Sequence, residues 1–340
     1  MNQKKHSFNK VNYLLRPCKQ IERKIMIETL KNLKLRKNIE KYNYIGMGSI
    51  HFYDFILIHK FLNMKSLISI DSKETKKRFD FNKPYDFIKF YNKKTTDFLA
   101  ELTWEKKENY VIWLDYDEVL KSYMFDDIAI IVQNCNPRDI LIFTLDARCP
   151  PEKDPDNDKR FPRKEFWDEF GGYTSKKFNN ISYVKPKYFI ELLQNICLNF
   201  IKEKVSFQEI KFHKIFSFKY KDGAQMLTLG GVLDKNDNII KKIKNFDYLS
   251  TDEHIVEIDA PILTYHEKFH LDSMIDKCKN LIDDYEQQLK SKKKLDGKKI
   301  IKTMEKKMNE TLPFELSSIN ELRYFVKYYK YFPQYYEGII

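Results

Sequence analysis

The stretch NYIGMGSIHFYDFILIHKFLNMKSLISID, residues 43–71, predicts how the fold begins. Its first residues are prone to form a strand, and Gly46 and Gly48 mark the turn that follows. A helical pattern comes next, and the apolar run 66–70 gives a second strand that ends at Asp71. A strand, a glycine turn, a helix and another strand in this order are typical of an α/β fold with a parallel sheet.

Similar units follow along the chain. Short apolar runs are separated by charged, helical stretches, and they lack the apolar-polar alternation of a half-buried strand. Runs of this kind are typical of strands that are buried on both faces of a parallel sheet. The strands predicted in this way lie at 43–45, 66–70, 87–90, 110–114 and 139–145.

A hairpin is predicted after these five strands. Two β-rich runs, 213–220 and 225–233, flank the dipeptide Asp222-Gly223, which is a hairpin signal. We therefore expect an α/β fold with a doubly wound, seven-stranded sheet, in which five parallel strands are followed by a closing antiparallel hairpin.

Charge and helical periodicity divide the chain into three predicted parts. Residues 1–40 form a basic N-terminal arm with an amphipathic helix, since residues 1–41 carry twelve Lys and Arg but only three acidic side chains. Residues 41–240 form the sheet domain, with a Pro-, Asp- and Lys-rich insertion at 148–185, and residues 241–340 form a mostly helical extension. The basic regions either attract phosphate backbones and acidic partners or are solvated helix faces.

The composition indicates a folded protein outside the membrane. Hydrophobic residues make up 42% of the chain, yet no apolar run reaches the roughly 20 residues that cross a bilayer. The polar, basic start is not followed by the apolar segment of a secretory signal. Five cysteines without a C-x-x-C pair argue against a disulfide framework and a structural zinc site. We expect a cytoplasmic protein with reduced thiols and no membrane partner.

The ends of the first two strands form the first candidate site. Gly46 and Gly48 lie where a strand meets its helix, so that backbone N–H groups can approach a ligand there. Asp71 follows at the end of the next strand, where a carboxylate can accept hydrogen bonds from the hydroxyls of a ribose. The alternative is that Asp71 caps the following helix at the surface.

Together these stretches resemble the class I, Rossmann-like S-adenosylmethionine-dependent methyltransferases. The resemblance covers roughly residues 40–235 and includes the closing hairpin. It also extends to a narrower group, the predicted bacterial O-methyltransferases, through RPCKQIERK, YIGMGSIHFYDF, RFDFNKPY, IWLDYD and DGAQMLTLGG. The stretches that match the wider family are YIGMGS (44–49), ISID (68–71), IKFYNKKTTDFL (88–99), WLDYD (113–117) and ILIFTLDA (140–147).

The resemblance implies a cofactor cleft at the carboxyl ends of the strands. Gly46, Gly48 and Ser49 would lie beside the methionine part of S-adenosylmethionine, and Asp71 would hold the ribose. Thr96 and Asp97 would lie near the adenine. The chain departs from the family at two positions, which are Tyr44, where an acid is usual, and Ile50, where a third glycine is common.

Asp115 and Asp117 are the candidate catalytic residues, because two carboxylates follow a buried strand there. Either could remove a proton from the methyl acceptor or orient it. Together with Asp146 at the next strand end, they could instead bind Mg²⁺, which would resemble the metal-dependent O-methyltransferases. The alternative is that these aspartates cap the following helix.

Two features of the C-terminal region stay open. Residues 266–270 match the H-E-x-x-H pattern, so that a zinc hydrolase site at His266 and His270 is one reading and a surface helix the other. The stretch Tyr324 to Gly338 interleaves aromatic residues with lysines. It could stack on nucleobases, or it could pack on the core or on a second copy of the chain in a homo-oligomer.

These observations favour an S-adenosylmethionine-dependent methyltransferase. Its acceptor is an unidentified O- or N-nucleophile on a small molecule or a nucleic acid. The alternative is a non-catalytic module that binds a nucleotide or a nucleic acid on a methyltransferase-like scaffold, because Tyr44 and Ile50 alter the first motif.

Overall fold

The computed structural model describes residues 16–33, 35, 37–72, 76–153, 161–236, 248–251, 253–291 and 297–333. The chain divides into two compact units. One consists of Ile25–Glu257, and the other combines Met1–Lys24 with Ile258–Ile340. The boundary predicted at 240–241 and the first 15 residues of the predicted arm lie outside the described residues.

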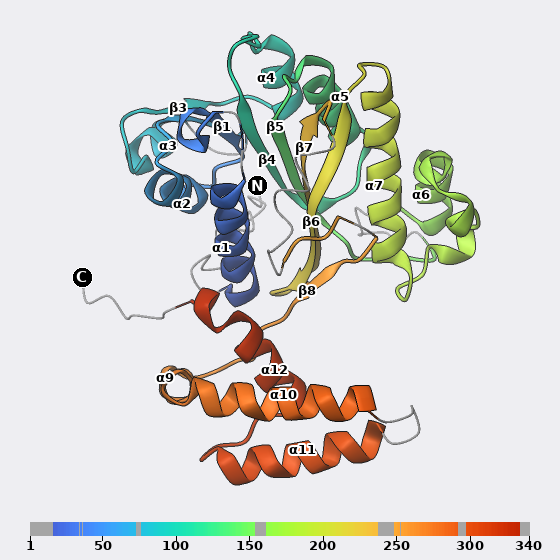
Figure 1. Cartoon of the computed structure of the whole chain (residues 1–340). Helices are drawn as coiled ribbons and strands as arrows, with labels where there is room; N and C mark the ends of the chain where they lie inside the picture. The colour runs from blue at the N-terminus through green and yellow to red at the C-terminus, as the bar shows by residue number, and fades with distance from the viewer. Residues whose placement is uncertain are drawn as a thin grey trace, which may run out of the picture. The chain divides into compact units, whose positions relative to one another are not determined.

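The larger unit is built on one mixed sheet with the strand order β3-β2-β1-β4-β5-β7-β6-β8 (Figure 1). The first five strands pair in parallel, and β7 pairs antiparallel with both β5 and β6, which confirms the parallel strands and the hairpin. The strands are β1 (Asn43–Gly46), β2 (Ser66–Ile70), β3 (Ile88–Tyr91), β4 (Tyr110–Val119), β5 (Asp139–Asp146), β6 (Lys211–Lys221), β7 (Gln225–Asp234) and β8 (Val256–Ile258).

Two details of the predicted sheet were wrong. Within the described residues the sheet has eight strands rather than seven, because β8 lies next to β6 at the edge. With only three residues, β8 is too short to show a strand pattern in the sequence. In addition, β4 runs on to Val119, so that Asp115 and Asp117 lie within the strand and not beyond its end.

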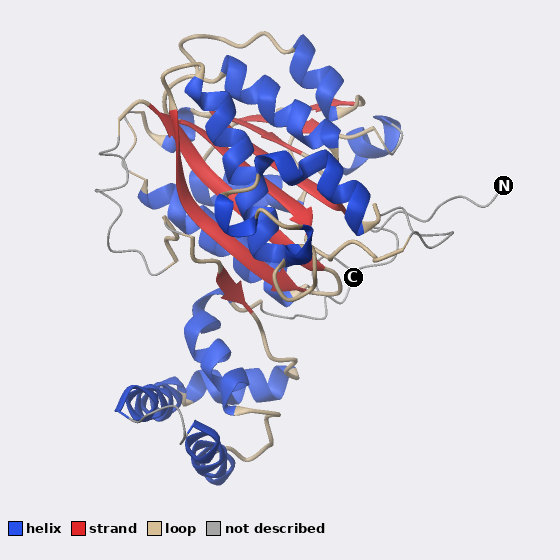
Figure 2. Cartoon of the chain, turned by 90° about the vertical axis from the view of Figure 1, so that its right-hand side faces the viewer, coloured by secondary structure: helices blue, strands red, loops and turns tan. Residues whose placement is uncertain are grey.

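Helices cover both faces of this sheet, as a doubly wound fold requires. Neighbouring residues of β1 point to opposite faces, so that Ile45 joins the core cluster that contains residues of α4, α5 and α7, while Tyr44 contacts Phe55 of α2. Figure 2 shows the strands as one twisted layer with helices packed against it. The helices up to β6 are α1 (Pro17–Asn32), α2 (Tyr53–Leu62), α3 (Lys76–Asn82), α4 (Thr95–Glu101), α5 (Ser122–Asn134), α6 (Arg163–Phe170) and α7 (Phe189–Ser206).

The predicted insertion at 148–185 belongs to the core of this unit. It contains α6 and three short 3₁₀ turns, and its side chains Phe166, Phe170 and Phe178 are buried in the same cluster as α5 and α7. Residues 154–160 lie outside the described part. The insertion therefore stabilises the sheet domain through apolar burial.

The second unit is mostly helical in its described part. It contains α9 (Tyr265–Ser273), α10 (Ile275–Ser291), α11 (Gly297–Thr311) and α12 (Ile319–Tyr328). Helix α11 buries Ile300, Met304 and Met308, which are four residues apart and so lie on one face of the helix. None of the described helices combines the length and the apolar character that crossing a membrane requires.

The aromatic stretch that begins at Tyr324 is packed for most of its described length. Phe325 and Tyr328 have no exposed surface, and Phe332 is 3% exposed. The ammonium group of Lys24 donates to the backbone carbonyls of Tyr331 at 3.1 Å and Phe332 at 3.3 Å. These buried rings support the packing interpretation over a stacking surface for nucleobases. Residues 334–338 of the stretch lie outside the described part.

Candidate functional site

Buried side chains pack closely against the glycine turn after β1. Gly46 is the last residue of β1, and a β-carbon at this position would lie 2.6 Å from the hydroxyl oxygen of Tyr44. A β-carbon on Gly48 would collide with the Ser69 hydroxyl and would lie 2.9 Å from the ring of Phe55. Both positions therefore need glycine for lack of space, and the backbone of the turn carries no side chain there.

The hydroxyl group of Ser69 is buried beneath this turn. Ser69 has no exposed surface, and its Oγ has no hydrogen-bond partner among the residues that the structure describes. In the sheet register it lies beside Gly46. A buried hydroxyl without a partner costs about 1–3 kcal/mol, so a polar group that no described residue satisfies lies next to the turn.

Asp71 lies where the sequence predicted it, directly after β2. Its backbone N–H donates to the carbonyl of Tyr91 at 3.2 Å, which holds the chain against the end of β3. The residue is half-buried. Because Gly46 pairs with Ser69, the strand register brings Asp71 to the same edge of the sheet as the glycine turn.

Ser49 is used by the turn itself. Its hydroxyl accepts a hydrogen bond from the backbone N–H of His51 at 3.3 Å, and its carbonyl accepts one from Phe52 at 3.0 Å. Phe52 has a φ of 47°, in the left-handed region, immediately before α2 begins. Ser49 thus stabilises the entry to α2 at the place where the methionine contact was predicted.

Thr96 and Asp97 lie together in the first turn of α4 but point to different surroundings. Asp97 is exposed. The hydroxyl of Thr96 donates a short hydrogen bond to the carboxylate of Asp127 in α5. The hydroxyl of Tyr116 donates to the other oxygen of the same carboxylate at 2.6 Å. Burial raises the pKa of Asp127 above the usual range of an aspartate, against the effect of these two donors.

The two candidate catalytic aspartates differ in exposure. Asp115 is half-buried and pairs with Thr144 of β5, whereas Asp117 is exposed. The register between β4 and β5 shifts after Asp115 and resumes at Val119, which leaves two extra residues in β4. Such irregularities are common beside active sites, because they redirect side chains at the end of a strand.

The predicted magnesium site is not formed. The carboxylate of Asp146 is 2% exposed and accepts hydrogen bonds from Arg148, through the backbone N–H at 2.9 Å and through Nε at 2.8 Å. The Arg148 guanidinium also forms an ion pair with it. No group of three or more His, Cys, Asp or Glu side chains could hold a metal ion within the described ranges. The positive charge of Arg148 takes the place that a cation would need.

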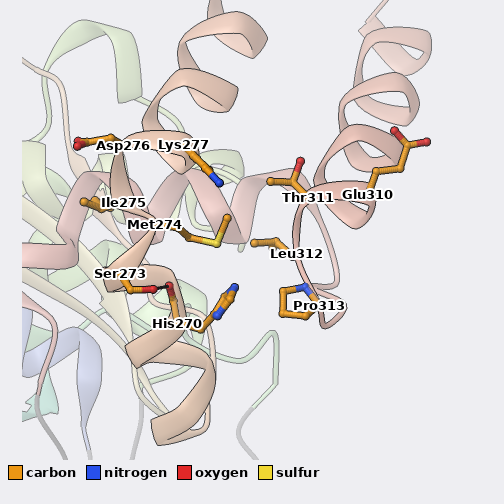
Figure 3. A pocket seen from close by; sticks show the side chains of 10 residues that line it. All are labelled: His270, Ser273, Met274, Ile275, Asp276, Lys277, Glu310, Thr311, Leu312 and Pro313. Atoms are coloured by element: carbon orange, nitrogen blue, oxygen red, sulfur yellow. Dashed lines mark hydrogen bonds between the residues drawn. The ribbon is translucent and has the colours of Figure 1, made fainter.

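The zinc interpretation of residues 266–270 was also wrong. Glu267 completes a capping box at the start of α9, in which its carboxylate accepts from the N–H of Thr264 at 2.7 Å. His270 faces a cavity of about 800 Å³ that lies between the start of α10 and the end of α11 (Figure 3). None of the residues predicted to bind a cofactor or to act in catalysis lines this cavity.

Sequence reasoning missed three members of the site region, namely Ser69, Tyr116 and Asp127. Ser69 and Asp127 each carried a weak signal, because Ser69 is a polar residue inside an apolar strand and Asp127 shares a helix face with apolar residues. Tyr116 gave no signal of its own in the sequence, where it is flanked by two aspartates.

Comparison with known proteins gives one family. Residues 11–340 match the family described as "Putative O-methyltransferase". No curated protein matches the chain significantly by sequence.

Several solved structures are distantly similar to this chain at low identity. Trm1 from Pyrococcus horikoshii with S-adenosyl-L-methionine is 12% identical with a TM-score of 0.42, over 71% of this chain and 60% of that one. The plantazolicin methyltransferase BpumL, in complex with a monoazolic desmethylPZN analog and S-adenosylhomocysteine, is 10% identical with a TM-score of 0.37, over 63% and 85%. LepI with S-adenosylhomocysteine and a substrate analogue is 13% identical with a TM-score of 0.34, over 60% and 46%. This chain therefore spans about half the length of LepI, and similarities this distant assign it neither a cofactor nor a substrate.

Proposed function

This chain belongs to the family described as "Putative O-methyltransferase", and we propose that it transfers a methyl group from S-adenosylmethionine to an O- or N-nucleophile. The acceptor is a small molecule or a nucleic acid.

The glycine turn and Asp71 carry this proposal. Gly46 and Gly48 lie in a tightly packed turn at the carboxyl edge of β1, and Asp71 follows β2 at the same edge. Backbone N–H groups and a carboxylate in this arrangement fit a nucleoside with two ribose hydroxyls. The unsatisfied hydroxyl of Ser69 beneath the turn supports a polar ligand or an ordered water molecule in this region.

Each of these residues would have its own role in binding or in methyl transfer. Asp71 would accept hydrogen bonds from the ribose, and the turn from Gly46 to Gly48 would let the backbone approach the amino-acid part. S-adenosylmethionine supplies a methyl group on a positively charged sulfur, which keeps the bonding electrons when a nucleophile takes the methyl carbon. Asp115 would orient the acceptor and receive its proton, because it is half-buried in β4, beside the register shift, whereas Asp117 is exposed.

Magnesium has no part in the proposed reaction. The residues predicted to bind it do not fit the ion, since Arg148 already neutralises the buried carboxylate of Asp146. Proton removal therefore falls to a side chain, and Asp115 is the best placed of the predicted candidates.

Calorimetric titration with S-adenosylmethionine and S-adenosylhomocysteine tests the cofactor. We expect binding of both by the wild-type protein and a loss of at least about tenfold in affinity for Asp71→Ala, since a ribose-binding carboxylate makes charged hydrogen bonds. Asp86→Ala is the matched control, because Asp86 is an exposed aspartate that precedes β3 at the opposite edge of the sheet. Equal binding by the wild-type protein and Asp71→Ala would refute the ribose assignment.

Transfer of a labelled methyl group tests catalysis. Wild-type protein is incubated with methyl-labelled S-adenosylmethionine and separate small-molecule and nucleic-acid fractions of a cell extract. Asp115→Asn should keep cofactor affinity and lose incorporation, whereas Asp117→Asn should retain most of it. If the wild-type protein binds the cofactor but labels neither fraction, the non-catalytic binding module is the better description.

A further inference from the structure

We infer that Asp127 is a positioning residue that fixes two walls of the proposed cofactor site through one buried carboxylate. The inference rests on the proposed function, because it assigns a role within the same site. Asp127 lies in α5 and touches neither the glycine turn nor Asp71 in any hydrogen bond that the structure describes. It would act only through Thr96 and Tyr116.

The geometry links two segments that the sequence keeps apart. Thr96 Oγ1 donates to one oxygen of the Asp127 carboxylate, and the Tyr116 hydroxyl donates to the other at 2.6 Å. Thr96 adjoins Asp97 in the first turn of α4, on the side where the adenine contact was predicted. Tyr116 lies in β4 between Asp115, which is proposed to orient the acceptor, and Asp117. One carboxylate thus sets the separation of the two segments.

The surroundings of Asp127 disfavour the charged form of its carboxylate. Asp127 has no exposed surface, and within the described residues no Lys, Arg or His forms an ion pair with it. The charged and titratable groups that face it are Asp126 of its own helix, Asp97 of α4, and Tyr116 and Tyr123. The two aspartates disfavour a negative charge here, and apolar side chains of similar volume would pack at lower cost.

A positioning role explains why a carboxylate occupies this unfavourable place. The two hydroxyl donors are directional, so that they fix the Tyr116 ring and the Thr96 side chain in one orientation each. Tyr116 packs edge-on against Tyr123, and α4 packs against α5, which transmits the constraint to both segments. An apolar core would hold the same elements together without specifying these orientations.

Asp139 offers a matched control in the same sheet domain. It also has no exposed surface, and it accepts hydrogen bonds from Asn109 Nδ2 at 2.9 Å, Tyr110 N at 2.9 Å and Asn136 N at 2.8 Å. Burial raises its pKa as well, to about 6. However, it begins β5, at the edge of the sheet opposite to the proposed site. Asp127→Asn and Asp139→Asn therefore make the same chemical change at the two edges.

The experiment compares affinity for S-adenosylhomocysteine with thermal stability in the two variants. Both substitutions should lower the melting temperature. Asp127→Asn should also weaken binding at least about tenfold, the effect of one lost buried hydrogen bond of 1.4 kcal/mol, whereas Asp139→Asn should change it less than twofold. Equal affinities of the two variants at comparable stability would overturn the inference.

A double-mutant cycle separates positioning from direct contact. Thr96→Val keeps the shape of the side chain and removes its hydroxyl. If Thr96 acts through Asp127, this substitution weakens binding in the wild-type protein and has little further effect in Asp127→Asn. If Thr96 instead contacts the adenine directly, the loss is the same in both backgrounds, and the inference is wrong.

Hydrogen exchange keeps the inference testable without a cofactor. Asp127→Asn should speed amide exchange at 95–98 and 115–118 compared with Asp139→Asn, because the carboxylate restrains both segments. Unchanged exchange there would contradict the positioning role even if the wild-type protein bound no S-adenosylhomocysteine. Absence of binding by the wild-type protein, with faster exchange in Asp127→Asn, would overturn the proposed function and leave the structural restraint in place.

Discussion

The hydroxyl oxygen of Tyr44 lies 2.6 Å from the point that a β-carbon on Gly46 would occupy. One residue separates Tyr44 from Gly46 in β1, so both lie on the same face of the sheet. The Tyr44 side chain therefore leans along the strand toward its carboxyl end. Tyr44 is 2% exposed and packs edge-on against Phe55 with ring centroids 5.1 Å apart. The Tyr44 phenol therefore fills the space next to position 46 and requires glycine there.

We expect Gly46→Ala to destabilise the protein by about 1–3 kcal/mol, the usual cost of forcing an extra carbon into a packed core. The Tyr44 ring cannot move away easily, because Phe55 packs against it. Tyr44→Leu removes the ring, so that Gly46→Ala should cost much less in that background. Urea unfolding of the four proteins measures the difference.

Gly172→Ala is the control for this substitution, since no atom lies within 4 Å of a β-carbon at that position. It should change the free energy of unfolding by about 0.5 kcal/mol or less. A Gly46→Ala variant as stable as Gly172→Ala would mean that the Tyr44 ring has room to move.

Ser69→Ala should make the ligand-free protein more stable by about 1 kcal/mol. The substitution removes a buried hydroxyl that has no partner within the described residues, and it leaves the neighbouring contacts unchanged. Ser217→Ala should do the opposite, because the equally buried Ser217 hydroxyl donates to Gln194 Oε1. Thermal unfolding of both variants without ligand gives the two signs. If Ser69→Ala is destabilised as much as Ser217→Ala, the Ser69 hydroxyl is already hydrogen-bonded to water.

The parallel strands were predictable because burial on both faces leaves an unmistakable apolar run, as in residues 139–145. The continuation of β4 was not, since Asp115 and Asp117 break the apolar pattern while the backbone keeps its extended form. The strand β8 could not be found either, because three residues give no period to recognise.

The arrangement of the candidate site was predictable only where it depends on position along a strand. The positions of Gly46 and Asp71 could be predicted, because each lies where a predicted strand ends. The contacts of Ser69 with Gly48 and of Thr96 with Asp127 depend on how elements pack, and Thr96 and Asp127 are 31 residues apart in sequence. Pairing of Asp146 with Arg148 was equally hidden, because neighbouring residues in a sequence need not point toward each other.

Magnesium and EDTA should leave the affinity for S-adenosylhomocysteine unchanged. Of the three carboxylates predicted to bind the ion, Asp146 is already neutralised by Arg148. The other two are not part of any group of three or more possible metal ligands among the described residues. Calorimetry in the two buffers measures the affinity. A tightening of binding by magnesium alone, abolished in Asp115→Asn, would restore the metal site.

The titration of Asp139 should produce a fall in stability as the pH rises from about 4 to about 6. Burial raises the pKa of Asp139 to about 6 in the folded protein, above the value of roughly 3.9 for an exposed aspartate. Between these two values the folded protein binds the additional proton, so that the free energy of unfolding decreases with rising pH.

Asp139→Asn should remove this component of the pH dependence, because an amide does not titrate. Relative to the variant, the wild-type protein should lose up to about 3 kcal/mol across the window, since one pKa unit corresponds to 1.36 kcal/mol. Urea unfolding of both proteins at several pH values between 4 and 7 measures the difference, in which the titrations of all other groups cancel. Parallel curves for the two proteins would show that Asp139 is charged throughout and that its three hydrogen-bond donors outweigh its burial.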